Sequence, residues 1–152
     1  MAAERFIYIV DDDPAIRRSL ERLMDAVGFQ VASYATPKAF LDVAGSLLGG
    51  CVLLDLRMPE MDGFEVHARL RSINPDLPVI VVTAQGDVQT AVRAMKAGAV
   101  DFIEKPYGDD ALIAAIESAL KTSAARGRTD DIAMAAELIN TLRRSEEHTS
   151  EL

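Results

Sequence analysis

Short apolar runs alternate with stretches of helical period along most of the chain. Five runs have the length and apolar character of β-strands, and they cover residues 6–10, 30–35, 51–54, 79–82 and 101–104. Each is followed by a stretch with helix caps or with apolar residues at helical spacing, over residues 14–27, 37–45, 64–73, 88–97 and 109–123. The pattern predicts five successive strand–helix units.

The strand runs also indicate the fold class. "CVLL" and "VIVV" are apolar at every position, which is typical of strands buried on both faces of a parallel sheet. Each crossover then has to lay its helix over one face of that sheet. The sequence therefore predicts a doubly wound α/β fold, in which five parallel strands are flanked by five helices.

Composition agrees with one globular domain and excludes several classes of protein. The 152 residues are 49% apolar, which is enough for one core. The formal net charge of −8 gives no basic footprint for nucleic acid or an anionic membrane. The single cysteine, Cys51, lies in an apolar run and indicates a reduced, structural thiol. Because neither a signal peptide nor a run of membrane-spanning length is found, we expect a soluble cytoplasmic protein.

Polar side chains directly follow four of the five strands. They are Asp11, Asp12 and Asp13 after the first strand, Asp55 after the third, Thr83 after the fourth and Lys105 after the fifth. Ligands of doubly wound sheets bind outside the carboxyl ends of the strands, so we expect these side chains to converge at one edge. Taken singly, Asp13 is most simply a helix N-cap, Thr83 a strand-end residue and Lys105 a surface charge.

Taken together, these residues fit phosphoryl transfer to a carboxylate. Asp11, Asp12 and Asp55 would repel one another without a cation, and Mg²⁺ suits such a site because it binds through a few oxygens. Asp55 can attack phosphorus as the nucleophile and form an acyl phosphate. Lys105 and the metal would neutralise charge on the phosphoryl oxygens, and Thr83 would donate a hydrogen bond to one of them.

Four motifs occur in order at these strand ends: "IVDDD", "VLLDLRMPEMDG", "VVTA" and "DFIEKPY". Over residues 4–123 they resemble the signature of response-regulator receiver domains of two-component signalling. The resemblance implies a flavodoxin-like, CheY-like sheet with strand order 2-1-3-4-5. It also implies that a sensor histidine kinase supplies the phosphoryl group for Asp55.

The resemblance implies further roles at the site. The implied Mg²⁺ ligands are Asp11, Asp12, Asp55 and the backbone carbonyl of Arg57. Thr83 and Phe102 would form a switch, with Phe102 standing where many members carry Tyr; plain core packing is the alternative for this ring. The Lys105–Pro106 bond is expected to be cis. The domain is expected to be no enzyme beyond its own phosphorylation from a phosphodonor and slow autodephosphorylation.

In the implied switch, phosphorylation repacks the surface of the fourth helix, the fifth strand and the fifth helix. The charged residues expected to be exposed on this surface are Arg93, Lys96, Asp101, Glu104 and Asp109. We therefore predict a phosphorylation-dependent homodimer through it.

The sequence changes character after Ser123. Residues 124–143 form a polar connector and an amphipathic stretch whose apolar residues are Ile132, Ala135, Ala136, Ile139 and Leu142. This stretch resembles the linker helix that precedes a helix-turn-helix domain in FixJ-type and NarL-type transcription factors, so DNA binding would belong to a domain outside this chain. A dimerising or fraying tail is the alternative.

Residues 144–152, "RSEEHTSEL", have no apolar period and look like the translation of a sequencing-library adapter. We expect an assembly artefact and a natural protein that continues past Arg143 or Arg144. His148 is therefore not assigned as a phosphoacceptor.

Two other functions remain open at this stage. A haloacid-dehalogenase-like phosphohydrolase would use Asp11 as the nucleophile with Asp13 beside it, but it would leave Asp55 without a role. A receiver-like module that binds its partners without phosphorylation is the second alternative, although such modules usually lack one of the acids, the Thr or the Lys. Uptake of a phosphoryl group on Asp55 is expected for a phosphorylated receiver domain and for neither of these two alternatives.

Overall fold

The computed structural model describes residues 5–84 and 86–122. The strands are β1 (Phe6–Val10), β2 (Gln30–Tyr34), β3 (Cys51–Leu54), β4 (Val79–Thr83) and β5 (Asp101–Glu104). The helices are α1 (Pro14–Val27), α2 (Pro37–Ala44), α3 (Gly63–Ile73) and α4 (Val88–Lys96), with a further helix over residues 109–122. The predicted elements are confirmed to within one or two residues at each end. The predicted linker helix and the adapter-like segment lie outside the described residues.

The five strands form one parallel sheet in the order β2-β1-β3-β4-β5. This confirms the expected doubly wound topology. Strand order reverses at β1, which pairs with β2 on one side and with β3 on the other. Val10 at the end of β1 is paired with Leu54 at the end of β3. The residues that follow β1 and β3 therefore lie side by side.

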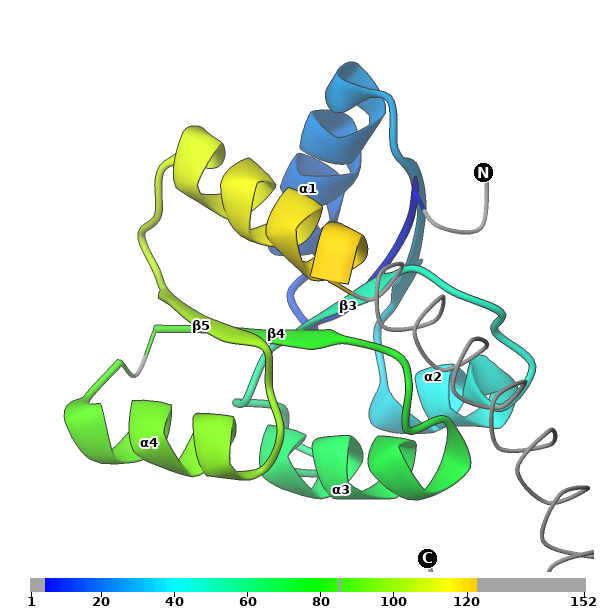
Figure 1. Cartoon of the computed structure of the whole chain (residues 1–152), viewed down its shortest axis with the longest axis vertical. Coiled ribbons are helices and arrows are strands. Elements are labelled where there is room, and N and C mark those ends of the chain that lie inside the picture. The colour runs from blue at the N-terminus through cyan, green and yellow to red at the C-terminus, as the bar shows by residue number, and fades with distance from the viewer. Residues whose placement is uncertain (1–4, 85, 123–152) are drawn as a thin grey trace, which may run out of the picture.

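Helices cover both faces of the sheet (Figure 1): α1 and the helix over residues 109–122 lie on one face, and α2, α3 and α4 on the other. Successive strand residues point to opposite faces. In β1, Ile7 and Ile9 therefore join the core under α1, while Tyr8 and Val10 join the core over α2 to α4. β3 and β4 divide in the same way, so two apolar layers hold the strands rigidly between them.

Local caps fix where the helices begin. Asp13 accepts hydrogen bonds from the backbone N–H groups of Ala15 and Ile16 at the start of α1. Thr36, Asp62 and Asp87 cap α2, α3 and α4 in the same manner. The N-cap that the sequence predicts for Asp13 is confirmed.

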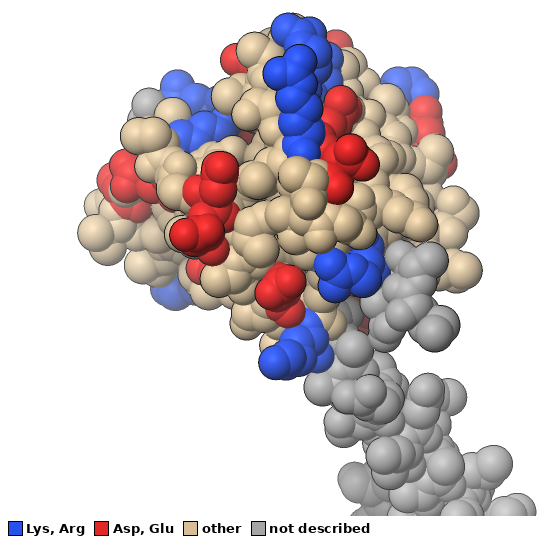
Figure 2. Space-filling view, turned by 90° about the horizontal axis from the view of Figure 1, so that it is seen from above, with Lys and Arg blue, Asp and Glu red and all other residues tan. Residues whose placement is uncertain are grey.

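The described part of the chain contains no helix that is both long and apolar enough to cross a membrane. On the face seen in Figure 2, which α1 and the helix over residues 109–122 form, basic side chains lie next to acidic ones.

Candidate functional site

Three carboxylates meet at the point where strand order reverses. Asp11 follows β1 directly and Asp55 follows β3, and the pairing of these strands brings the two side chains together. One carboxylate oxygen from each of Asp11, Asp12 and Asp55 lies within 4.8 Å of the others. The convergence predicted for these three acids is confirmed.

Asp11 is held from several directions. Its side chain is only 5% exposed, and one oxygen lies 3.2 Å from the Lys105 Nζ. The other oxygen accepts a hydrogen bond from the backbone N–H of Asp13 at 2.9 Å. Its backbone carbonyl accepts a hydrogen bond from Arg17 at 2.7 Å. Asp11 is therefore fixed in place and already paired with the lysine that follows β5.

Asp55 sits at the end of a fully buried strand. Its backbone N–H donates to the carbonyl of Val10 at 3.0 Å, and its Oδ1 accepts from the backbone N–H of Arg57 at 3.3 Å. Burial and the neighbouring charge of Asp11 raise the pKa of Asp55 to about 6, against the lowering effects of Lys105 and the Arg57 N–H. The Asp55 carboxylate is thus held rigidly, and nearby positive charge only partly stabilises its ionised form.

Thr83 and Lys105 come from adjacent strand ends. The backbone N–H of Lys105 donates to the carbonyl of Thr83 at 2.8 Å, which ties the end of β4 to the residue after β5. Thr83 is completely buried. The peptide bond between Lys105 and Pro106 is cis, as expected.

Phe102 lies on β5 beside Val81 of β4. The ring is half-buried and packs against the apolar core on the α2 to α4 side of the sheet. This is the plain packing role that remained the alternative for Phe102. A switch role for the ring remains a prediction.

Sequence reasoning missed two residues at this site. A Cβ added to Gly63, at the start of α3, would lie 2.6 Å from the Leu56 Cα and 2.7 Å from the Asp55 carbonyl oxygen. Only glycine therefore lets α3 approach the segment that carries Asp55. The other residue is Tyr107, whose pKa is raised by burial and by the charges of Asp109 and Asp11. The Asp62-Gly63 pair was visible in the sequence as a turn signal, and Tyr107 was visible only as the last residue of the motif "DFIEKPY", which does not indicate that it lies near Asp11.

The chemistry of the cluster fits a small divalent cation. Its donors are all carboxylate oxygens, which Mg²⁺ prefers. Two of the three acids, Asp11 and Asp55, are buried; burial and the neighbouring charge of Asp11 raise the pKa of Asp55, and Lys105 acts in the opposite direction. A cation bound here would remove that repulsion.

A family model of the response regulator receiver domain matches residues 7–117. The chain belongs to this family. Receiver domains are signalling domains of two-component systems, and they bind Mg²⁺ at an acidic pocket of the kind formed here.

Several regulators of known name are similar to this receiver. The transcriptional regulatory protein FixJ of Bradyrhizobium diazoefficiens is 44% identical over 133 residues, covering 88% of this chain and 65% of that protein. The response regulator protein TmoT of Ectopseudomonas mendocina is 43% identical over 118 residues, covering 78% of this chain and 54% of its own length. The chain thus spans between about half and two thirds of these relatives.

Solved structures agree with the receiver fold. Full-length FixJ from B. japonicum superposes with a TM-score of 0.76 at 44% identity, covering 86% of this chain and 64% of FixJ. A CheY-like receiver from Methanospirillum hungatei JF-1 superposes with a TM-score of 0.75 at 28% identity, covering 80% of this chain and 98% of that structure.

Proposed function

We propose that this receiver accepts a phosphoryl group on Asp55 from a sensor histidine kinase in a Mg²⁺-dependent reaction. The observation that carries this proposal is the position of Asp55: a rigid strand end, within 4.8 Å of two further carboxylates. Lys105 reaches the same cluster through its contact with Asp11.

Each residue has a distinct role in the proposed reaction. Mg²⁺, held by Asp11, Asp12, Asp55 and the backbone carbonyl of Arg57, would offset charge on the phosphoryl oxygens. An Asp55 oxygen forms the new bond to phosphorus while the bond to the donor nitrogen breaks. The Lys105 ammonium stabilises the charge that spreads over the transferring group. No other turnover is proposed beyond slow hydrolysis of the acyl phosphate.

The proposed output is a change in the surface around α4 and β5. Thr83 would donate to a phosphoryl oxygen on Asp55, and Phe102 would occupy the space that Thr83 leaves. The charged residues predicted on this surface are all exposed: Arg93, Lys96, Asp101, Glu104 and Asp109.

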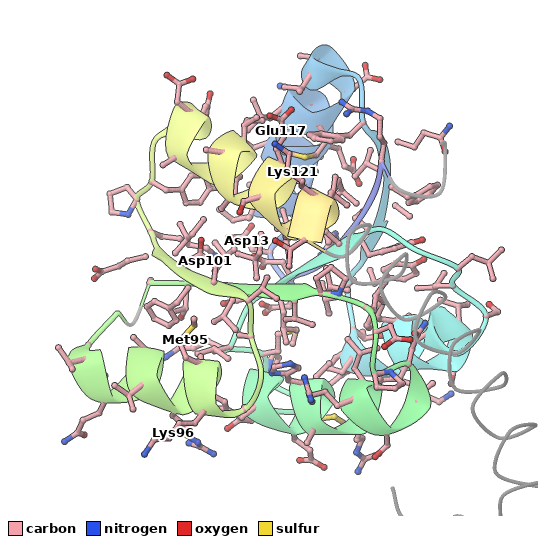
Figure 3. All side chains as sticks on the ribbon, in the orientation of Figure 1. Asp13, Met95, Lys96, Asp101, Glu117 and Lys121 are labelled. Carbon is pink, nitrogen blue, oxygen red and sulfur yellow. The ribbon has the colours of Figure 1, made fainter. Side chains whose placement is uncertain are left out.

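Exposed apolar residues lie on the same surface. Val88, Val92 and Met95 follow one another at helical spacing on α4 and are 78%, 46% and 47% exposed. In Figure 3, Met95 lies on the side of α4 that faces β5, where Asp101 is labelled, and Lys96 lies on the outer side of α4. The mixture of apolar and charged groups is typical of an interface, which supports a homodimer formed upon phosphorylation.

The transcriptional role is proposed for the longer protein. The similarity of this chain to transcriptional regulatory proteins named FixJ supports a receiver over residues 4–123 and a linker over residues 124–143. The linker would lead to a DNA-binding domain outside this chain.

The two alternatives find less support at the site. Asp13, which a phosphohydrolase would need beside Asp11, uses its Oδ1 to cap α1 at 2.9 Å from the Ala15 N–H. A module that binds without phosphorylation would not need the acid cluster, Thr83 and Lys105, and all of them are present at their strand ends.

The experiment that tests the function is intact-mass analysis after incubation with Mg²⁺ and acetyl phosphate. We expect the wild type to gain one phosphoryl group, and we expect Asp55→Asn or EDTA to abolish the gain. A label that survives Asp55→Asn and disappears in Asp11→Asn would instead support the phosphohydrolase. No label on the wild type would support the binding module.

A further inference from the structure

At the end of the domain opposite the aspartate cluster, α2, α3 and the loop after α2 carry three exposed apolar side chains; among the described residues, Val27 at the end of α1 is also exposed at this end. Leu48, between α2 and β3, is 93% exposed; Ile73, at the end of α3, is 45% exposed; and Val43, near the end of α2, is 37% exposed. We call these three residues the α2–α3 platform. A lone exposed leucine is ordinary on a protein surface. The platform can form a binding surface only if its three side chains are held in fixed positions close to one another.

Hydrogen bonds hold the backbone of this region in place. The Asn74 side-chain amide, just past α3, donates to the carbonyls of Ala44 at 3.0 Å and Leu47 at 2.9 Å. The Tyr8 hydroxyl donates to the carbonyl of Gly49 at 2.9 Å. The loop that carries Leu48 is therefore tied to α3 on one side of Leu48 and to β1 on the other.

Packing joins Ile73 to the same loop. A Cβ added to Gly45 would lie 3.2 Å from the Ile73 Cγ2, so the isoleucine side chain rests against the loop. Leu47, in the same loop, is half-buried and packs against the core. With Leu47 turned inward and its carbonyl bonded to Asn74, Leu48 is held outward.

The chain leaves the described domain at this same end. Each crossover helix runs back toward the start of the next strand, and the helix over residues 109–122 runs in the same direction. The ends of α2, α3 and this last helix therefore lie at the edge of the sheet where the strands begin (Figure 1). Residues 123–131 can reach up to about 30 Å when extended, which is about the diameter of a small domain. Residues 132–142 are therefore within reach of the platform.

We propose that residues 132–142 dock on the α2–α3 platform of the same chain. Ile132, Ile139 and Leu142 recur at helical spacing and would give a helix an apolar stripe that meets Leu48 and Ile73. The docked segment would leave the α4–β5 surface free, so this proposal does not depend on phosphorylation or on the proposed dimer.

The small size of the platform favours a tethered segment over a second copy. A stable interface between separate molecules buries about 800 Å² on each partner. Three side chains, two of them more than half covered, offer far less. A short tether supplies a high effective concentration, so a small apolar contact suffices within one chain.

Hydrogen–deuterium exchange of the full 152-residue chain tests the docking. An isolated helix of this length is marginal in water, so protection of the backbone amides of residues 136–142 reports contact with the domain. We expect these amides to exchange at least about tenfold more slowly than in an unstructured chain. Both Leu48→Ser and Leu142→Ser should remove the protection.

Val88→Ser is the matched control, because Val88 is 78% exposed on α4, away from the platform. It should leave the protection of residues 136–142 unchanged. The proposal is overturned if the wild type shows no protection, or if Leu48→Ser leaves the protection intact. Protection that rises with protein concentration would also overturn it and would indicate that a second copy occupies the platform.

Discussion

At the scale of single residues, the electrostatics of Asp55 links the site to the stability of the fold. The carboxylate lies next to Asp11 in a buried site and has only partial compensation from Lys105. Groups that are destabilised in their charged form lower the stability of the folded state once they ionise. The same arrangement that would prepare Asp55 for a cation and a phosphoryl group in the proposed reaction therefore costs folding free energy when neither is bound.

This cost predicts a pH dependence in EDTA. The pKa of Asp55 rises from 3.8 to about 6 on folding, so between these values the folded state binds more protons than the unfolded state. The contribution of Asp55 to the free energy of unfolding therefore falls as pH rises through this window, by up to about 3 kcal/mol at about 1.4 kcal/mol per pKa unit. Asp55→Asn should consequently be more stable than the wild type at pH 7 and similar to it at pH 4.

Urea denaturation of both proteins at the two pH values measures the difference. Equal stability of Asp55→Asn and the wild type at pH 7 would contradict the raised pKa. Millimolar Mg²⁺ should stabilise the wild type more than Asp55→Asn at pH 7, because the cation offsets the same repulsion.

Asp13 allows a second test at the residue scale. Its carboxylate caps α1 through the N–H groups of Ala15 and Ile16, so Asp13→Ala should cost about 1 kcal/mol of unfolding free energy. Uptake of a phosphoryl group from acetyl phosphate should continue at nearly the wild-type rate, because Asp13 has no direct role in the proposed transfer. Loss of uptake in a folded Asp13→Ala protein would favour the phosphohydrolase.

At the scale of elements, the start of α3 positions the segment that carries Asp55. The backbone N–H of Gly63 donates to the carbonyl of Leu56 at 3.0 Å, and the close approach of the two backbones leaves no room for a Cβ. The start of α3 is therefore held directly against the loop after β3. A substitution at Gly63 should displace Asp55, although the two residues are eight positions apart in sequence.

Gly63→Ala should destabilise the domain by about 1–3 kcal/mol, since the contacts at 2.6 and 2.7 Å are with backbone atoms that cannot turn away. Phosphoryl uptake should also become slower, because Asp55 is displaced with the loop. Thermal denaturation and intact mass measure the two effects. Gly108→Ala is the control: its surroundings are open and its φ lies outside the left-handed region, so its stability should be unchanged or slightly higher.

At the scale of the whole molecule, the two ends of the sheet carry different surfaces. The acid cluster lies at the carboxyl end of the strands, and the α2–α3 platform lies at the other. The exposed stripe of Val88, Val92 and Met95 lies on α4, on the surface proposed for dimerisation. The proposed phosphorylation site and the proposed docking site for residues 132–142 are therefore separated by the length of the strands.

The homodimer can be tested by sedimentation at micromolar concentration. The phosphorylated wild type should sediment faster than the unmodified protein, whereas equal sedimentation of the two forms would contradict dimerisation. Val92→Asp places a charge in the α4 stripe and should weaken the dimer by about tenfold or more, while uptake of the phosphoryl group continues. Val27→Asp, at a position 37% exposed at the end of α1, should leave the dimer intact.

The sequence by itself determined the elements of this protein, the caps of its helices and the identity of the acids, Thr83 and Lys105. These features depend on residues close together in the chain: an apolar run makes a strand, and Asp13 caps a helix that begins at the next residue. The motifs also identified the family before any geometry was known.

Only the tertiary structure decided how the site is assembled and what surrounds it. Lys105 meets Asp11 across 94 positions of sequence, and the pKa of Asp55 depends on burial by elements far from it along the chain. The need for glycine at position 63 and the outward position of Leu48 likewise follow from contacts between separate elements. Local propensity acts over a few neighbouring residues, whereas burial, charge proximity and close backbone approach exist only after the sheet and its helices have packed.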